Sequence, residues 1–411
     1  MFGTLFLKEC RQVLRSLVYY IYVIVFVLFM TSQMSSEGSA GFREPMPGES
    51  YYGETITHDE TLIMEGTLKN LLQGIIYNSF ATYPMGFYKE VKLSDSEAVQ
   101  AKEILERCTG KTFEALQEEM INYYNQFSAE NPEAAMEAAN YRVPVKEGFT
   151  YEEFGEAMEE ICRIVGKGSD YEKDNYENRI EVPMTYEQAK EEYDNLCTKD
   201  RLTRACMRLF CDYAGIMLAI LPIFVGVSRA LRDKRAKAQQ VMFSKPASGA
   251  LIIVSRYLAN LAMLCLPVIA TAFLLQQPYY YKAQTLGVQG DIWAFLTVPG
   301  VWLVPEIMIV LALSFLITEC TDTILAVFVQ VAWGIGDLFG ATTLVGNFGL
   351  KLVARWNTLG ETALYVSQEK ALWYNRGYYF LLSIFCVVLT VIVYERKRGR
   401  GGSLLWKNTK S

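Results

Sequence analysis

Six apolar segments divide this chain of 411 residues. Each segment is almost free of charged side chains, and they lie at residues 17–34, 209–228, 250–275, 294–317, 323–345 and 377–394. An α-helix rises about 1.5 Å per residue, so about 20 apolar residues cross a hydrocarbon core roughly 30 Å thick. We therefore predict a mainly α-helical membrane protein with six transmembrane helices.

The segment between the first two apolar runs differs in charge from the rest of the chain. Residues 36–200 hold 34 of the 45 acidic and 15 of the 39 basic side chains, a balance of −19. The other residues hold 11 acids and 24 bases, a balance of +13, and the two balances sum to −6. We predict three regions. Residues 1–35 contain the first span, residues 36–205 form a domain, and residues 206–411 contain the five later spans. The sequence gives no sign of a nucleic-acid partner, and we predict none.

Basic side chains in short loops predict the orientation, because cytoplasmic loops hold an excess of them. With the N-terminus inside, the cytoplasmic segments hold Lys8, Arg11, Arg15, the basic loop after the second span, Arg396, Lys397, Arg398, Arg400, Lys407 and Lys410. Two groups oppose this orientation: Arg201, Arg204 and Arg208, and four basic residues in 346–376. We predict that both termini are cytoplasmic and that the 36–205 domain is extracellular.

Residues 1–17 have the pattern of an amphipathic helix. Phe2, Phe6 and Leu14 belong to a face of apolar side chains, and Lys8, Glu9, Arg11, Gln12 and Arg15 fill the opposite face. We expect this helix to lie at the inner membrane interface, although it could also extend the first span into the cytoplasm. The apolar run that follows is longer than an ordinary signal sequence, which favours an uncleaved span.

The 36–205 domain has helical periodicity at residues 96–127 and 150–166 and from Thr185 onward, with Thr150 as an expected N-cap. The short stretch RIEVPM is its main strand signal. Three cysteines lie within the domain, at Cys108, Cys162 and Cys197. A disulfide among them and ordinary buried thiols are equally good predictions, and the sequence does not indicate a pairing.

Catalytic and metal-binding patterns are not evident in the sequence. The single histidine, His58, has acids beside it and is expected to be a solvated surface residue. CTGKTFEAL at 108–116 contains the GKT with which a phosphate-binding loop ends. However, Leu105 stands where that loop needs its first glycine. We predict that the chain is not an enzyme and holds no metal or other cofactor of its own.

The loop after the second span, RALRDKRAKAQQVMFSKPASG at 229–249, is unusually basic. Its RDKRAKAQQVMF part contains neither glycine nor proline and is expected to form a short helix with apolar residues at its end. Such a helix can lie on anionic lipid or dock in the groove of a partner protein. The residues themselves do not decide between these two interpretations.

The order of these parts resembles the permease half of bacterial ABC exporters of the ABC-2 type, in the subgroup with a large external domain between the first two spans. The matching features are the MFGTLFLKECRQVLRSL lead-in, the long insert, the loop RAKAQQVMFSKPASGALIIVSRYLAN, the proline-containing VPEIMIVLALSFLIT and the short ECTDT turn. The resemblance covers the whole layout, but it reaches the level of residues only in the loop and the fourth span. The family often has an acid and a glycine where this loop begins with a basic run.

The resemblance implies that the loop is a coupling helix seated in a separate ATPase subunit, which binds the ATP and magnesium. Val241, Met242 and Phe243 would be the seated residues, with Arg232, Lys234 and Arg235 holding the register by charge. A second permease copy or a related permease would complete the pathway in the bacterial cell membrane, where membrane lipid surrounds the spans. The expected cargo is an amphipathic or hydrophobic compound, such as a peptide or a drug.

Two acids lie inside apolar segments, where a carboxylate is costly and usually faces a protein interior, a cavity or a partner. Glu306 follows Pro305 in the fourth span, and Asp337 lies near the outer end of the fifth. Each acid is either part of a substrate or ion pathway or a hydrogen-bond partner between helices. Two other functions also fit the chain: an ion-coupled transporter or channel that uses Glu306 without ATP, and a membrane-anchored binding or sensing protein.

Overall fold

The computed structural model describes residues 1–34, 42–49, 51–84, 88–126, 140–244, 246–339, 344–346 and 348–399. The chain is mainly helical and divides into two compact units. The first, the helical unit, comprises Met1–Arg43, Asp194–Leu338 and the chain from Leu344 onward. The second, the inserted unit, is formed mostly by Glu44–Tyr193. This division agrees with the predicted insertion of a domain after the first apolar segment.

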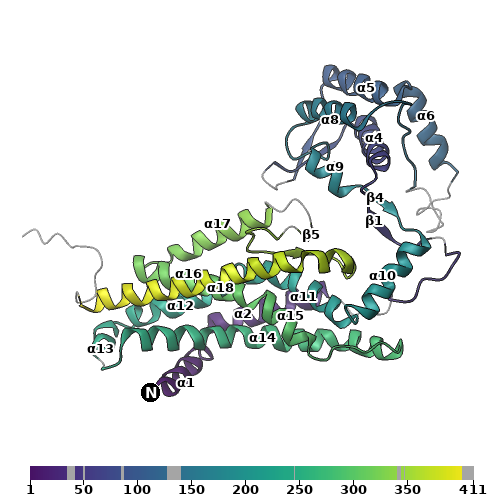
Figure 1. Cartoon of the computed structure of the whole chain (residues 1–411). Helices are drawn as coiled ribbons and strands as arrows, with labels where there is room; N and C mark the ends of the chain where they lie inside the picture. Colours follow the sequence, from purple (N-terminus) through teal and green to yellow (C-terminus); the bar gives the residue numbers. More distant parts are fainter. Residues whose placement is uncertain are drawn as a thin grey trace, which may run out of the picture. The chain divides into compact units, whose positions relative to one another are not determined.

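The helical unit contains the apolar helices, drawn lengthwise in Figure 1. Its elements are α1 (Phe2–Val13), α2 (Leu17–Gln33), α11 (Thr203–Leu218), α12 (Leu221–Arg235), α13 (Gln239–Phe243), α14 (Gly249–Thr285), α15 (Ala294–Trp302), α16 (Val304–Thr321), α17 (Leu325–Phe339) and α18 (Thr362–Gly399), with a two-stranded sheet of β5 (Val345–Gly346) and β6 (Arg355–Trp356). Helices α14, α16 and α18 pack against one another, and α12 packs on α16.

The described helices include three that are long and apolar enough to cross a membrane, α14, α16 and α18. The number rises to five if α1 with α2, bent by 70°, and α11 with α12, bent by 44°, each form one span. Helix α17 is apolar but has only 15 residues. The helices thus agree with a multi-pass membrane protein, while the predicted number of six is not confirmed. The predicted fourth span is divided at Leu303 into α15 and α16, because Pro305 is accommodated in the first turn of a new helix.

The break between α11 and α12 lies in the predicted second span. Pro222 stands in the first turn of α12, and a buried side chain from α17 reaches the break: Gln330 Nε2 donates to the carbonyl of Ala219 at 2.7 Å. A backbone carbonyl without a partner is costly in an apolar environment. The glutamine therefore stabilises the bend by replacing a missing helical donor.

Helix α14 contains a second interruption, at Pro267. Proline has no N–H, so the carbonyl four residues earlier, at Met263, lacks its helical partner. The Tyr19 hydroxyl of α2 donates to this carbonyl at 3.1 Å, and the Tyr22 hydroxyl donates to Leu264 O at 2.8 Å. The first apolar helix thus binds α14 through two buried hydroxyl groups.

Close packing of α12 on α16 depends on a glycine. A Cβ at Gly226 would collide with the Oγ of Ser314, and it would stand 3.1 Å from a methyl group of Leu311. Small residues allow helix backbones to approach in this way, which increases van der Waals contact between them. The approach places the end of α12, and with it the basic loop, beside α16.

The inserted unit is a small helical domain with two short two-stranded sheets. Its helices are α4 (Glu60–Tyr77), α5 (Asp95–Thr109), α6 (Phe113–Tyr124), α8 (Tyr151–Val165), α9 (Lys173–Arg179) and most of α10 (Tyr186–Thr198). Strand β1 (Glu54–Ile56) pairs with β4 (Glu181–Pro183), and β2 (Phe80–Thr82) pairs with β3 (Lys89–Val91), both antiparallel. The predicted helical character, the helix after Thr185 and the strand in RIEVPM are confirmed.

The local sequence explains the ends of these helices. Thr150 caps α8 as predicted, in a capping box with Glu153. The predicted helix 96–127 is divided into α5 and α6 by the GKT stretch, because Gly110 takes a left-handed conformation, φ +70°, and Thr112 caps α6. Helices α4, α5 and α8 enclose an apolar core around the fully buried Leu68 and Phe154.

The candidate disulfide in this unit is not formed. Cys108 and Cys162 are both thiols, so no pairing remains among Cys108, Cys162 and Cys197 in the described chain. Burial raises the pKa of the Cys108 thiol to about 12, which keeps it protonated and unreactive. Cys108 is thus an ordinary core residue, which was the other interpretation of these cysteines.

Candidate functional site

The basic loop at 229–249, called the elbow below, is the candidate site. The predicted single helix over RDKRAKAQQVMF is wrong: α12 continues to Arg235, the chain turns at Lys237 with φ 52°, and α13 occupies only Gln239–Phe243. The turn forms because the helical unit holds both ends of the elbow, and one straight helix could not reach both attachment points. Lys245 of the elbow and the predicted basic tail from Arg400 onward lie outside the described residues.

The three apolar residues at the end of the elbow do not share one environment. Val241 is 61% exposed, whereas Met242 and Phe243 pack on a small buried cluster that includes Ala247 and Tyr394. The Phe243 ring lies edge-on to Tyr394, with 5.4 Å between ring centroids. Of the three residues predicted to enter a partner, Val241 therefore presents most of its side chain outward, and the other two attach the elbow to its own unit.

The last turns of α18 hold the elbow by its backbone. Arg398 donates to Phe243 O at 2.9 Å and to Ala247 O at 2.7 Å, and Glu395 accepts from Gly249 N at 2.5 Å. At the start of α14, the Ser248 hydroxyl caps the helix by accepting from Leu251 N at 3.2 Å. Displacing α13 therefore strains its connections to both α14 and α18.

The basic residues predicted to set the register lie in different places. Arg232 donates to Gln12 O of the N-terminal segment at 3.5 Å, and Lys234 lies 3.7 Å from Asp322 at the end of α16. Arg235 is exposed. All three cations are exposed, and Arg232 and Lys234 also contact other segments of the helical unit.

A group of four charged residues at the base of the elbow, three of them buried, was not predicted. The Arg229 guanidinium of α12 binds Glu9 of α1 with two hydrogen bonds, of 2.6 and 2.7 Å. Arg256 of α14 lies 3.7 Å from Glu9 and donates to Asp233 at 2.6 Å, while Arg229 also lies 3.4 Å from Asp233. Two acids and two arginines thus join α1, α12 and α14.

This quartet corrects the prediction for the N-terminal helix. Glu9 was placed on the polar face of a helix lying at the interface, but it is only 7% exposed and points into the unit. The two arginines require a carboxylate there, since buried charges are retained where they are paired. Phe2, Leu7 and Leu14 of the same segment are exposed and remain available to lipid.

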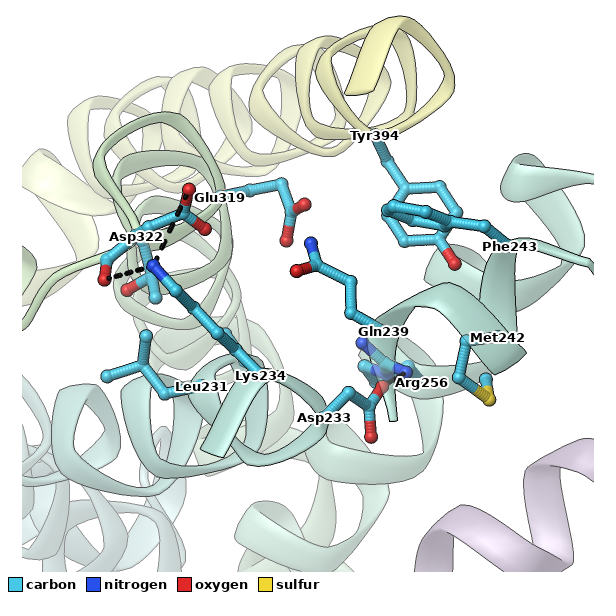
Figure 2. Close-up of a pocket in the computed structure, with 12 residues that line it drawn as sticks. Leu231, Asp233, Lys234, Gln239, Met242, Phe243, Arg256, Glu319, Asp322 and Tyr394 are labelled. Carbon is cyan, nitrogen blue, oxygen red and sulfur yellow. Dashed lines mark hydrogen bonds and ion pairs between the residues drawn. The ribbon is translucent and has the colours of Figure 1, made fainter. Parts of the chain in front are cut away.

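A second charged group faces the quartet across a narrow pocket. Lys397 of α18 lies 2.9 Å from Asp322 and 3.6 Å from Glu319 of α16, and Lys234 also approaches Asp322. Figure 2 shows Asp233 and Arg256 on one side of the pocket, Glu319 and Asp322 on the other, and Gln239 of α13 between them. The cavity volume is about 20 Å³, close to that of one water molecule, so this pocket is a junction of helices and is too small for a transported substrate.

The two acids in the apolar helices also have partners within the helical unit. Glu306 is fully buried, and one of its oxygens lies 3.4 Å from Arg376 of α18, whose Nη1 also donates to Leu352 O at 3.0 Å. Asp337 accepts from Val353 N at 2.8 Å. These contacts favour the interpretation of both acids as links between segments. The partner of Glu306 is an arginine, whereas a neutral hydrogen bond was expected. A place for either acid in a pathway stays a prediction.

Two further ion pairs involve basic residues that conflicted with the predicted orientation. Arg208 is buried, pairs with Asp200 and lies 4.5 Å from the Tyr365 ring centroid. Arg355 pairs at 2.8 Å with the buried Asp212. Because these arginines are neutralised inside the unit, they carry little information about orientation. The sequence signal that could have revealed them is an unexpected cation in one segment together with an unexpected acid in another.

Comparison with family models, with curated proteins and with solved structures finds no match to this chain. The fold and the charged junctions therefore stand as the basis for any statement about function.

Proposed function

We propose that this chain is the permease subunit of an ABC exporter of the ABC-2 type, and that the elbow docks on a separate ATPase subunit. In this proposal both termini and the elbow face the cytoplasm of a bacterial cell. The inserted unit is extracellular, and a second permease copy or a related permease completes the pathway. The ATPase partner binds ATP and magnesium, and the cargo is amphipathic or hydrophobic, such as a peptide or a drug.

The observation that carries the proposal is the attachment of α13. A coupling element needs a surface that a partner can contact and a firm connection to the spans that must move. Val241 and Arg235 supply an apolar and a basic contact at the surface of the elbow. Phe243, Ala247 and Gly249 are held by α18, and Gly249 begins α14.

The quartet extends this connection to other helices. A displacement of α12 acts on α1 through Arg229 and Glu9 and on α14 through Asp233 and Arg256. Buried ion pairs of this kind are costly to separate, because the partner left behind remains desolvated. A closing motion of two ATPases would thus move α1, α12 and α14 together. Lipid binding by the elbow alone would require no such junction.

The test is capture of the partner at the elbow. The full chain carrying a photo-crosslinking side chain at Val241 is isolated from its native membrane, and the captured protein is identified and assayed for ATP hydrolysis. We expect capture of a nucleoside triphosphatase whose hydrolysis depends on this chain. In the chain without the crosslinking side chain, Val241→Asp should abolish both co-purification of this partner and the coupled hydrolysis. Val99→Asp is the matched control, because Val99 is 54% exposed on α5 of the inserted unit.

Two results would overturn the proposal. One is purification of the transport-active chain without any ATP-hydrolysing partner. The other is transport that continues without ATP and fails in Glu306→Gln, which would select the ion-coupled alternative. Unchanged binding and hydrolysis in Val241→Asp would show that the partner contacts the chain elsewhere.

A further inference from the structure

A second pocket lies wholly within the inserted unit and is large enough for a ligand. Its cavity volume is about 550 Å³, within the range of roughly 300 to 1,000 Å³ that is typical of small-molecule sites. Helix α4 and the start of β2 line this open pocket, together with Asp170 and Tyr171. The groups that line it show which chemistry it can bind.

Aromatic rings form the apolar part of this pocket. Tyr77, at the end of α4, is 73% exposed, whereas Phe80 and Tyr171 are buried with ring centroids 6.2 Å apart. Phe80 lies over Gly74, where a Cβ would stand 2.5 Å from the ring, so the glycine sets the shape of the floor. The lining of the pocket thus includes one exposed aromatic ring and two buried ones.

The end of α4 is fixed, which holds Tyr77 in place. The next residue, Asn78, has a left-handed backbone, φ 44°, and its side-chain amide exchanges two hydrogen bonds with the backbone of Leu93, of 3.1 and 2.8 Å. A site whose groups are already positioned loses less conformational entropy when it binds. Tyr77 is therefore exposed without belonging to a loose segment.

The polar groups at the rim retain hydrogen-bonding capacity. Among the described residues, no hydrogen bond engages the Asn70 amide or the Tyr171 hydroxyl, and Gln73 makes only a long one, 3.4 Å, to Tyr124. Amides and hydroxyls both donate and accept. The rim therefore suits a ligand with many hydroxyl groups.

The charges at the pocket argue for a neutral ligand. No lysine or arginine lines it in the described chain, so a phosphate or carboxylate would have no cation to bind. Its one lining acid, Asp170, already pairs with Arg179 at 3.1 Å, so a cationic ligand would have to compete for it. A neutral compound with hydroxyl groups around apolar C–H faces fits both conditions.

We propose that this pocket binds a neutral oligosaccharide. A pyranose ring lies with its C–H face on Tyr77, and its hydroxyl groups bond to Asn70, Gln73 and Tyr171. This site is separate from the elbow and does not depend on the nature of any partner that binds there.

The test is saturation-transfer NMR and calorimetry on the full chain in a detergent without sugar headgroups, since alkyl glycosides would occupy the site. The probes are neutral trisaccharides of glucose and of N-acetylglucosamine, with inorganic phosphate and a tetralysine peptide as charged comparisons. We expect saturable binding of at least one trisaccharide, and roughly tenfold weaker binding in Tyr77→Ala, as expected for loss of one aromatic contact.

Two variants serve as controls. Tyr77→Phe keeps the ring and should bind nearly as the parent does, and Tyr88→Ala removes another tyrosine of the same unit, 64% exposed, that does not line the pocket. Asn70→Ala should also weaken binding, because it removes rim hydrogen bonds. The proposal is overturned if neither trisaccharide binds, if Tyr77→Ala and Asn70→Ala bind as the parent does, or if phosphate or tetralysine is the only probe bound.

Discussion

The two units place their charged side chains in opposite ways. In the helical unit several ion pairs are buried: Arg229 with Glu9, Arg208 with Asp200, and Arg376 with Glu306. In the described part of the inserted unit the ion pairs lie at the surface, as with Arg107 and Glu160, whose side chains are 51% and 38% exposed. The inserted unit has its own apolar core and uses its charges at the water interface.

The difference shows how charged side chains contribute to the association of segments in each unit. Apolar association between helices is weak in lipid, because lipid tails are as apolar as the helices. Several of the buried pairs join segments far apart in the chain: Glu9 and Arg229 are separated by 220 residues, and Asp212 and Arg355 by 143. In the helical unit, then, charge specifies which segments meet, and in the inserted unit apolar packing does so.

The strongest test of this contrast is Arg229→Ala. The change leaves Glu9 buried with only the more distant Arg256, and breaking a buried pair in this way costs about 3–5 kcal/mol. This loss of stability is measured by denaturant unfolding of the detergent-solubilised chain, which is followed by tryptophan fluorescence. All six tryptophans lie outside residues 44–193, so the signal reports the helical unit.

The double variant Glu9→Gln/Arg229→Met is the matched control, because it removes both charges together. It should recover much of the lost stability. A cost below about 1 kcal/mol for Arg229→Ala would mean that the quartet is not energetically important.

Next in size is Leu68→Ala in the core of the inserted unit. Leu68 is fully buried, and such truncations cost about 2–5 kcal/mol through lost burial and the cavity left behind. Hydrogen exchange of α4 and α8 should accelerate while the tryptophan transition stays unchanged. Val99→Ala on α5 should change the stability of either unit by no more than about 0.5 kcal/mol. If the tryptophan transition shifts with Leu68→Ala, the two units unfold as one.

A smaller effect is expected from Arg107→Gln in the surface pair with Glu160. An exposed pair contributes less than about 1 kcal/mol and is screened by salt. A double-mutant cycle with Glu160→Gln, measured by hydrogen exchange of α5 and α8, should give a coupling that disappears at high salt. A coupling that equals that of the Arg229–Glu9 pair would remove the contrast between the units.

The smallest expected effect is a loss of stability of the inserted unit at low pH. The Thr150 backbone N–H, with the Thr150 hydroxyl, holds the pKa of the Glu153 carboxyl below its ordinary value of 4.5. The folded state therefore binds this proton less readily than the unfolded state. The stabilisation is complete above that value and is lost as the pH falls below it.

Glu153→Gln keeps the hydrogen-bonded cap but does not titrate. The parent should therefore lose stability more steeply than the variant below about pH 4.5, measured by hydrogen exchange of α8. Parallel curves would mean that the carboxylate contributes nothing to the acid sensitivity of this unit.

Much of the fold follows from local patterns in the sequence. Apolar periodicity indicated the insert and the membrane helices, and Thr150 and Thr185 indicated two helix starts. The errors have one physical origin, since a helix can break wherever the tertiary structure supplies a partner for the freed backbone groups. Gln330 does this at Ala219, and no local pattern joins two residues that are 111 positions apart.

The site was predicted less well than the fold. The elbow was identified by its basic residues, but the contacts that hold it come from Glu9, Arg256, Glu395 and Arg398, which lie on other segments. Glu9 was assigned to a polar face because amphipathic patterns separate charged from apolar residues. They do not distinguish a carboxylate in water from one that binds two arginines.

The hydroxyl groups of Tyr19 and Tyr22 have a consequence for biosynthesis. They belong to α2, which is synthesised before α14, and the carbonyls they bind follow 244 and 242 residues later. During translation, the first apolar helix must wait in the bilayer with both hydroxyls unsatisfied until α14 arrives, and the whole inserted unit is synthesised in that interval. These two links between α2 and α14 can therefore form only after the inserted unit and α12 have been made.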